Sequence, residues 1–193
     1  MTKRRQRLNV ILVSSSEAQR EAWIQEFSDL PNVSVQAGNI LDLEVDAIVS
    51  PSNALLRDDG GLDEAISRKM GPGLKMHAVN KMKKYHNGRL LVGQAMCVDA
   101  SKKNKRQGVK NVIYAPTMSS TRTLELASEN VFLATRGVLL LDREFALSRN
   151  SKKPTLYTIA FPALGTGAGG LSPVACARQM RRAFADVGQC SAK

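Results

Sequence analysis

Residues 155–184 read TLYTIAFPALGTGAGGLSPVACARQMRRAF, which passes from an apolar run through a glycine-rich loop into a helical pattern. The apolar run predicts a strand over 155–161, and Ser172 followed by Pro173 predicts a helix start. Four of the six residues at 165–170 are glycine, which accepts positive φ and allows a ligand to approach the backbone closely. Free N–H groups at a helix N-terminus favour an anion. We interpret the loop as a phosphate-binding loop, with a tight turn needed only for packing as the alternative.

The spacing of Gly165, Gly167 and Gly170 matches the GxGxxG fingerprint of dinucleotide-binding proteins. That fingerprint belongs to the first strand–helix–strand unit of its fold, with an acidic residue about 20 positions further on. Here no strand pattern follows the last helix, so we expect no standard NAD-binding half. The GxxxxGKS or GxxxxGKT pattern of nucleoside triphosphate-binding loops is absent as well. We therefore expect this loop to hold its ligand together with an earlier segment.

The 193 residues, 43% of them hydrophobic and 23% charged, are expected to form one globular domain. We predict a basic arm over 1–7, the domain over 8–187 and a tail over 188–193. No run approaches the roughly 18 apolar residues of a membrane span. Cys97 and Cys176 fall in strand and helix patterns and are expected to be small core residues, which favours a reducing, cytoplasmic setting. With two histidines and no His/Cys cluster, we expect no metal site, and we expect no cofactor.

Strand and helix patterns alternate along the chain. Ser14 and Glu17 form a capping-box pattern, and Trp23, Phe27 and Leu30 would share one face of the helix that follows. This alternation predicts an α/β domain with a mixed or mostly parallel sheet. The other expected elements are strands at 8–13, 33–37, 45–50, 91–98, 111–115 and 155–161, and helices at 62–70, 73–85, 123–148 and from 172 onward.

A second unusual strand end lies in residues 46–66, DAIVSPSNALLRDDGGLDEAI. The amide of Asn53 both donates and accepts hydrogen bonds, which suits a pair of ribose hydroxyls. Gly60 and Gly61 allow another close approach, and Asp63 falls in the first turn of a helix, where it is either a functional carboxylate or only a cap. In α/β sheets ligands bind at the C-terminal ends of strands. Two such loops predict a ligand with two phosphates and ribose hydroxyls.

The net charge of +11 is high for a chain of this length. It comes from separate clusters, and few aromatic residues accompany them. One interpretation is that these are solvated faces, and the other is that they attract nucleic acid or another polyanion over long range. The clusters are Lys3 to Arg5, Lys81 to Lys84, Lys102 to Arg106, Lys152–Lys153 and Arg181–Arg182.

Residues 46–66 and the segment IAFPALGTGAGG at 159–170 together resemble the two loop motifs of the macrodomain family. GNI at 38–40 and YAPTM at 114–118 add to the likeness, which covers about residues 8–187 and is closest to the phage and bacterial branch. The resemblance implies a three-layer α/β/α macrodomain-like fold with a central mixed sheet. It also implies binding of ADP-ribose or an ADP-ribosylated partner. Several members hydrolyse ADP-ribosyl bonds, ADP-ribose 1″-phosphate or O-acetyl-ADP-ribose.

The resemblance also assigns roles to residues of this chain. Asn53 would hold the distal ribose, and Asp63 would orient or activate a water near its anomeric carbon; these two are the candidate catalytic residues. The adenine would meet Asn39 and Ile40. Two loops would contact the phosphates through their backbone groups. The first consists of Gly60, Gly61 and Leu62, and the second of Gly165, Thr166, Gly167, Ala168, Gly169 and Gly170.

Two positions depart from the family pattern. Asn39 stands where the family usually has Asp, which removes charge assistance of about 1 kcal/mol from an adenine contact. Gly169 stands where many members carry an aromatic residue over the distal ribose, so the site is expected to be more open. Three functions stay open: an ADP-ribosyl hydrolase or ADP-ribose 1″-phosphate phosphatase, a non-catalytic ADP-ribose reader, and a basic nucleic-acid-binding protein on the same scaffold. The shortage of aromatic residues weakens the third.

Overall fold

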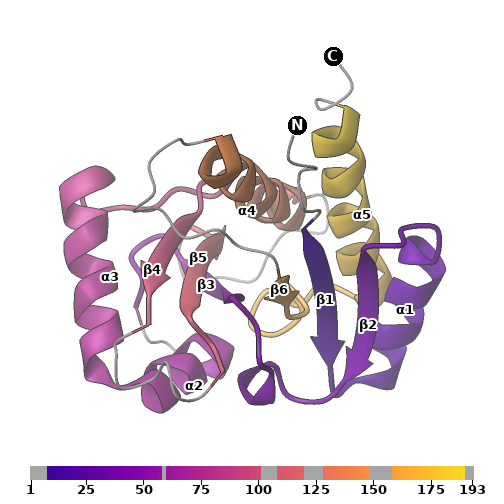
Figure 1. Ribbon diagram of the computed structural model, residues 1–193, viewed down its shortest axis with the longest axis horizontal. Helices are drawn as coiled ribbons and strands as arrows, with labels where there is room; N and C mark the ends of the chain where they lie inside the picture. The colour runs from indigo at the N-terminus through magenta and orange to yellow at the C-terminus, as the bar shows by residue number, and fades with distance from the viewer. Residues whose placement is uncertain (1–7, 58–59, 101–107, 120–127, 148–157, 190–193) are drawn as a thin grey trace, which may run out of the picture.

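The computed structural model describes residues 8–57, 60–100, 108–119, 128–147 and 158–189, with one six-stranded sheet at its centre (Figure 1). The strand order is β2-β1-β6-β3-β5-β4. All neighbours are parallel except β4 and β5, so the sheet is mixed, as predicted. The strands are β1 (Asn9–Ser14), β2 (Val33–Ala37), β3 (Ala47–Asn53), β4 (Met96–Asp99), β5 (Asn111–Met118) and β6 (Thr158–Phe161).

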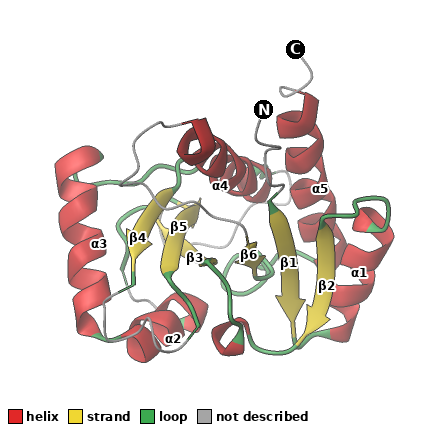
Figure 2. Cartoon of the chain, in the orientation of Figure 1, coloured by secondary structure: helices red, strands yellow, loops and turns green. Residues whose placement is uncertain are grey.

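Helices cover both faces of the sheet (Figure 2). Strand residues alternate between the faces: Val49 packs with the core under α1, α4 and α5, whereas Ile48 packs with the core under α2 and α3. This arrangement confirms the predicted three-layer α/β/α fold. The helices are α1 (Glu17–Phe27), the short 3-10 helix η1 (Ile40–Asp42), α2 (Gly61–Met70), α3 (Pro72–Tyr85), α4 (Asn130–Leu147) and α5 (Pro173–Gln189).

The predicted start of the first helix was wrong by two residues. Ser16, not Ser14, is the N-cap, and its hydroxyl accepts a hydrogen bond from the Gln19 N–H at 3.4 Å. Ser14 is unavailable as a cap because it belongs to β1, where it pairs with Ala37. Both serines fit the capping-box pattern, since Gln19 is three residues after Ser16, and strand pairing decided between them. Leu30 lies beyond the end of α1.

The predicted strand at 91–98 was also too long, because only Met96–Asp99 pairs with β5. Residues before it form a turn in which the Leu91 N–H donates to the Gln94 side chain at 2.9 Å and the Gln94 N–H donates to the Leu91 carbonyl. The long helix predicted at 123–148 begins at Asn130, and residues 120–127 and 148 lie outside the described residues. No helix in the described part of the chain is long and apolar enough to span a membrane.

Cys97 and Cys176 are buried free thiols, which confirms their prediction as core residues. Burial raises the pKa of each thiol to about 12, so neither is a thiolate at neutral pH. They therefore pack as small hydrophobic side chains in the core. The predicted domain limits stay a prediction; α5 continues through Gln189.

Gly137 allows α4 to lie directly against the turn before β4. A Cβ at this position would lie 2.5 Å from the Gly93 carbonyl oxygen and 3.0 Å from the Gly93 carbonyl carbon. Both are backbone atoms, which cannot rotate away as a side chain would. We predict that Gly137→Ala lowers the free energy of unfolding by about 2 kcal/mol through overpacking, measured by urea denaturation.

Gly73 in α3 provides the control, because a Cβ there would meet no heavy atom within 4 Å. Gly73→Ala should leave stability unchanged or raise it by about 0.5 kcal/mol. Equal stability of Gly137→Ala and the wild type would contradict the close approach.

Candidate functional site

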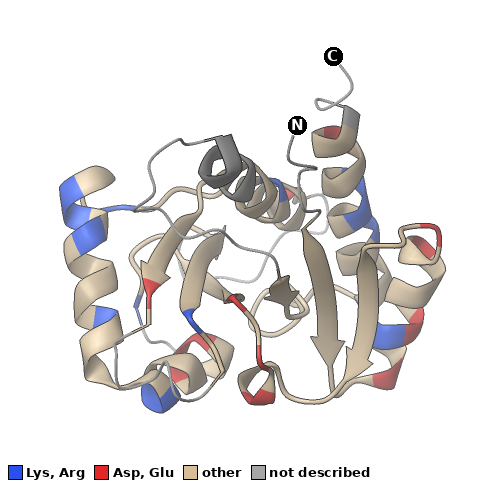
Figure 3. Ribbon diagram, in the orientation of Figure 1, with Lys and Arg blue, Asp and Glu red and all other residues tan. Residues whose placement is uncertain are grey.

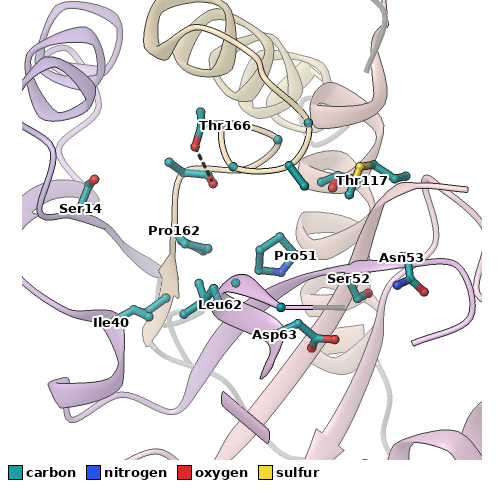
Figure 4. A pocket seen from close by; sticks show the side chains of 18 of the residues that line it. Ser14, Ile40, Pro51, Ser52, Asn53, Leu62, Asp63, Thr117, Pro162 and Thr166 are labelled. Atoms are coloured by element: carbon teal, nitrogen blue, oxygen red, sulfur yellow. Dashed lines mark hydrogen bonds between the residues drawn. The ribbon is translucent and has the colours of Figure 1, made fainter. Parts of the chain in front are cut away.

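An open cavity of about 940 Å³ lies at the C-terminal ends of the strands (Figure 4). Its walls come from the ends of β1, β3 and β5, from the start of α2 and from the loop after β6. The predicted site residues come together here with one exception, Gly170, which does not line the cavity. The lining residues that had been predicted are Asn39, Ile40, Asn53, Gly60, Gly61, Leu62, Asp63, Gly165, Thr166, Gly167, Ala168 and Gly169.

The loop after β6 is closed by its own backbone. The Gly170 N–H donates to the Gly167 carbonyl and the Leu171 N–H to the Gly165 carbonyl, each at 3.0 Å. Gly165 and Gly170 have φ of 71° and 70°, a conformation that glycine adopts without strain. The Gly170 N–H is therefore bonded within the loop, which explains why Gly170 does not line the cavity.

The middle of this loop presents backbone donors. Within the described residues, the N–H groups of Gly167, Ala168 and Gly169 donate to no protein acceptor. Gly167 and Ala168 are exposed at the cavity, and α5 begins a few residues later, capped by the Ser172 hydroxyl, which accepts from the Ala175 N–H at 3.2 Å. A run of such N–H groups before a helix forms an anion-binding concavity. The loop can therefore accept a phosphate group on its backbone.

Asn53 shapes the loop that follows β3. Its side-chain oxygen accepts hydrogen bonds from the Leu55 and Arg57 N–H groups at 3.0 and 3.1 Å, and its amide nitrogen donates to the Arg57 carbonyl at 3.1 Å. Leu56 in this loop has a φ of 53°, which a leucine rarely adopts. The amide therefore holds a strained turn in place, and its expected contact with a ribose stays a prediction.

Asp63 is held in a buried polar cluster on the cavity wall. The Ser50 hydroxyl donates to its Oδ1 at 2.6 Å, and the Lys75 ammonium lies 3.0 Å from its Oδ2. The side chains of Asp63 and Lys75 are only 6% and 16% exposed. Lys75 Nζ also lies 5.7 Å from the centre of the Tyr114 ring, within range of a cation–π contact. The cluster thus joins α2, α3, β3 and β5 at the site.

Sequence reasoning missed Lys75 and Ser50. Lys75 falls in a helix that was predicted to be basic and was given no role at the site, and Ser50 falls in an apolar strand. The sequence offers one indication for Ser50, which lies three residues before Asn53 near the end of the predicted strand. It offers none for Lys75. The residues that line the cavity but were not predicted lie on strand ends and loops: Val13, Ser14, Ser15, Gly38, Pro51, Ser52, Arg57, Thr117, Met118, Pro162 and Ala163.

The adenine-side residues lie on and beside η1. The Asn39 side-chain oxygen accepts from the Leu41 N–H at 3.0 Å and so caps this short helix. Ile40 is buried and presents an apolar surface at the cavity, where Figure 4 places it on the same side as Leu62. Of the described lining residues, only Arg57 and Asp63 carry a charge. The described residues also include no group of three or more His, Cys, Asp or Glu side chains that could hold a metal ion.

Comparison with known proteins agrees with this architecture. A family model described as Macro domain matches residues 49–180. An O-acetyl-ADP-ribose deacetylase of Salmonella gallinarum is 32% identical over 149 residues, which cover 77% of this chain and 75% of that protein. The macrodomain of Mycobacterium tuberculosis DarG gives a TM-score of 0.61 at 22% identity, covering 79% of this chain and 89% of that one. A mutant Oceanobacillus iheyensis macrodomain solved with ADPR gives 0.60 at 21% identity, covering 77% and 74%.

The Asp63–Lys75 pair generates a stability prediction. Lys75→Met would leave the buried carboxylate without its cation, so we expect the free energy of unfolding to fall by about 3 kcal/mol. For a chain of this length, that corresponds to a melting temperature lower by roughly 6–12 °C. Differential scanning calorimetry measures the shift.

Arg68→Met is the matched control, because Arg68 pairs with Glu64 at 2.6 Å on the same segment but its side chain is 76% exposed. Its removal should cost less than about 0.5 kcal/mol. Equal losses in the two variants would show that burial of the Asp63–Lys75 pair does not matter.

Proposed function

Because the chain belongs to the Macro domain family, we propose that its cavity binds ADP-ribose or an ADP-ribosyl derivative. One observation carries this proposal: two glycine loops about 100 residues apart in the sequence border a single cavity at the strand ends. Its volume of about 940 Å³ lies within the range of small-molecule sites. A long ligand with phosphates at its middle and a ring at each end fits two backbone loops flanked by polar and apolar walls.

In this proposal the diphosphate lies against the loop after β6. The N–H groups of Gly167, Ala168 and Gly169 would donate to phosphate oxygens, and the nearby start of α5 would favour their charge. The adenine would lie by Asn39 and Ile40, and the distal ribose would lie between the loop of Asn53 and the carboxylate of Asp63. Asp63 and Asn53 already make protein hydrogen bonds, but each carboxylate or amide oxygen has further lone pairs for a hydroxyl or a water.

Hydrolysis is the second candidate, and it is supported by the deacetylase to which the chain is 32% identical. In such a reaction, water adds to the acetyl carbonyl, the ester C–O bond breaks, and acetate and ADP-ribose leave. Asp63 would orient that water. Ser50 and Lys75 each hold one carboxylate oxygen of Asp63, and a carboxylate fixed in this way suits the positioning of a water.

A non-catalytic reader is the alternative within the same cavity. Asn39 and Gly169, which depart from the family pattern, favour this alternative because they reduce charge assistance at the adenine and leave the distal ribose uncovered. Water exclusion and positioning contribute to rate, so an open distal site favours binding over turnover. A turnover measurement separates the two functions once binding has been established.

The binding proposal predicts micromolar ADP-ribose affinity in the wild type, measured by isothermal titration calorimetry. Affinity should change little between about 50 mM and about 200 mM salt, because pocket binding releases few counterions compared with nucleic-acid binding. Gly167→Val should weaken binding at least about tenfold. A Cβ at Gly167 meets no heavy atom within 4 Å, so the added side chain enters open space by the loop and leaves the fold intact.

Gly73→Val, at another glycine with open space around it, should retain wild-type affinity. Thermal unfolding of both variants checks that they are folded. Absence of ADP-ribose binding to the wild type at low salt would refute the proposed function.

The hydrolase candidate predicts release of acetate from O-acetyl-ADP-ribose by the wild type. Asp63→Asn should reduce turnover by at least about 100-fold, the usual range for a group that positions or activates the reacting water, while ADP-ribose still binds. The double variant Asp63→Asn with Lys75→Met removes both charges of the buried pair and checks that loss of activity does not arise from an unpaired lysine. Binding without turnover in the wild type would establish the reader.

A further inference from the structure

One segment of the chain is free of acidic residues and forms one side of the molecule. No Asp or Glu occurs between Glu64 and Asp99. Figure 3 shows α3 at the outer edge beside β4, with basic residues along it. The segment carries seven cationic residues: Arg68, Lys69, Lys75, Lys81, Lys83, Lys84 and Arg89. Such one-signed charge creates a positive potential on that side.

Four of these cations have partners in the protein. Lys75 holds Asp63, as described above, and Lys81 Nζ donates to the Cys97 carbonyl at 2.6 Å. Arg68 and Lys69 pair with Glu64 and Asp42, respectively. The other three, Lys83, Lys84 and Arg89, are exposed near the C-terminal end of α3 and form no ion pair within the described residues.

The opposite flank of the molecule differs in this respect. Arg178, Arg181 and Arg182 of α5 pair with Glu26, Asp29 and Glu129 at 3.5, 2.8 and 2.7 Å. Both arginines of the basic cluster at Arg181–Arg182 therefore have an acidic partner, Asp29 in the turn after α1 and Glu129 just before α4. Of the basic clusters in the described residues, only the one at the end of α3 has cations that form no ion pair with an acidic side chain.

A hollow of about 350 Å³ lies beside these three cations. It is lined by Tyr85, His86, Asn87, Arg89, Leu91 and Gln94. Tyr85 and Leu91 are 63% and 53% exposed, and Lys84 Nζ lies 5.1 Å from the centre of the Tyr85 ring. Burial, followed by the charge of Lys81, lowers the pKa of His86, so its imidazole is neutral at pH 7 and can bond to a base edge.

We propose that this end of α3, defined by Lys83, Lys84, Tyr85, Arg89 and Leu91, binds single-stranded nucleic acid. Backbone phosphates lie by the three cations, and one base stacks on Tyr85 and Leu91. An exposed aromatic ring among cations is the combination that single-strand-binding surfaces use. A duplex keeps its bases stacked on one another, so it leaves Tyr85 and the hollow without a partner.

The site is separate from the cavity. α3 has 14 residues, so its C-terminal end lies roughly 21 Å along the helix axis from the end that meets α2. Figure 1 shows α3 running away from α2 along the edge of the molecule. The proposal therefore does not rest on ADP-ribose binding, and the two can be tested independently on the same variants.

The test is fluorescence anisotropy with labelled oligothymidylate and oligouridylate of about 12 nucleotides, and with a duplex of the same length. Lys83→Gln with Lys84→Gln should weaken binding of the single strands about tenfold. It should also reduce the slope of log affinity against log salt by about 1.4, or about 0.7 for each lost phosphate contact. Tyr85→Ala should weaken binding at least about fivefold without any change of charge.

The charge-matched control is Arg178→Gln with Arg181→Gln, which removes the same two charges from α5 and should stay within about twofold of the wild type. Equal weakening by both double variants would show that net charge alone drives binding, and would overturn the site. Equal affinity for duplex and single strand, with no effect of Tyr85→Ala, would overturn it as well. The DNA and RNA arms distinguish recognition of phosphate and base alone from recognition that includes the ribose 2′-hydroxyl. Titration of ADP-ribose into each variant should give the wild-type affinity.

Discussion

Parallel pairing between β3 and β6 at the centre of the sheet is the constraint on which the site depends. Ala47 lies opposite Ile159 and Ile48 opposite Ala160, so the two strands run side by side and end at the same edge. Each strand ends in a proline-containing segment and then a glycine loop. Loops far apart in the sequence therefore open onto one cavity. The helices on both faces keep this pair buried, which is why the strands read as almost continuous apolar runs.

The polar groups at the cavity are fixed by bonds inside the protein. Asn53 holds its own turn, Asn39 caps η1, and Asp63 is held between Ser50 and Lys75. A site built in this way is organised before a ligand binds. The conformational entropy of these side chains is therefore lost on folding and not on binding. The cavity wall thus combines rigid polar side chains from β3 and α2 with a backbone loop after β6.

The basic residues on the two flanks of the molecule differ in whether they have acidic partners. On α5 they form ion pairs with acidic residues of neighbouring elements, where exposed pairs contribute little to stability. On α3 one of them, Lys75, supports the cavity, and others stay exposed beside an aromatic residue. Net charge alone does not distinguish these cases, since an arginine facing a carboxylate and an exposed lysine count equally. Only the positions of the acidic partners separate structural cations from those available to another molecule.

The alternation of strands and helices, the glycine loops and the resemblance to macrodomains were sufficient to predict the layers of the fold and about half of the residues that line the cavity. These features are local, because strand and helix periods and glycine conformations involve residues close together in the chain. The tertiary structure decided which serine caps α1, since β1 pairing uses Ser14. It also decided that Gly170 closes its own loop, and that Lys75 and Ser50 hold Asp63. Each of these outcomes depends on a residue that folding brings close in space. Periodicity and spacing along the chain do not predict which residues become such neighbours.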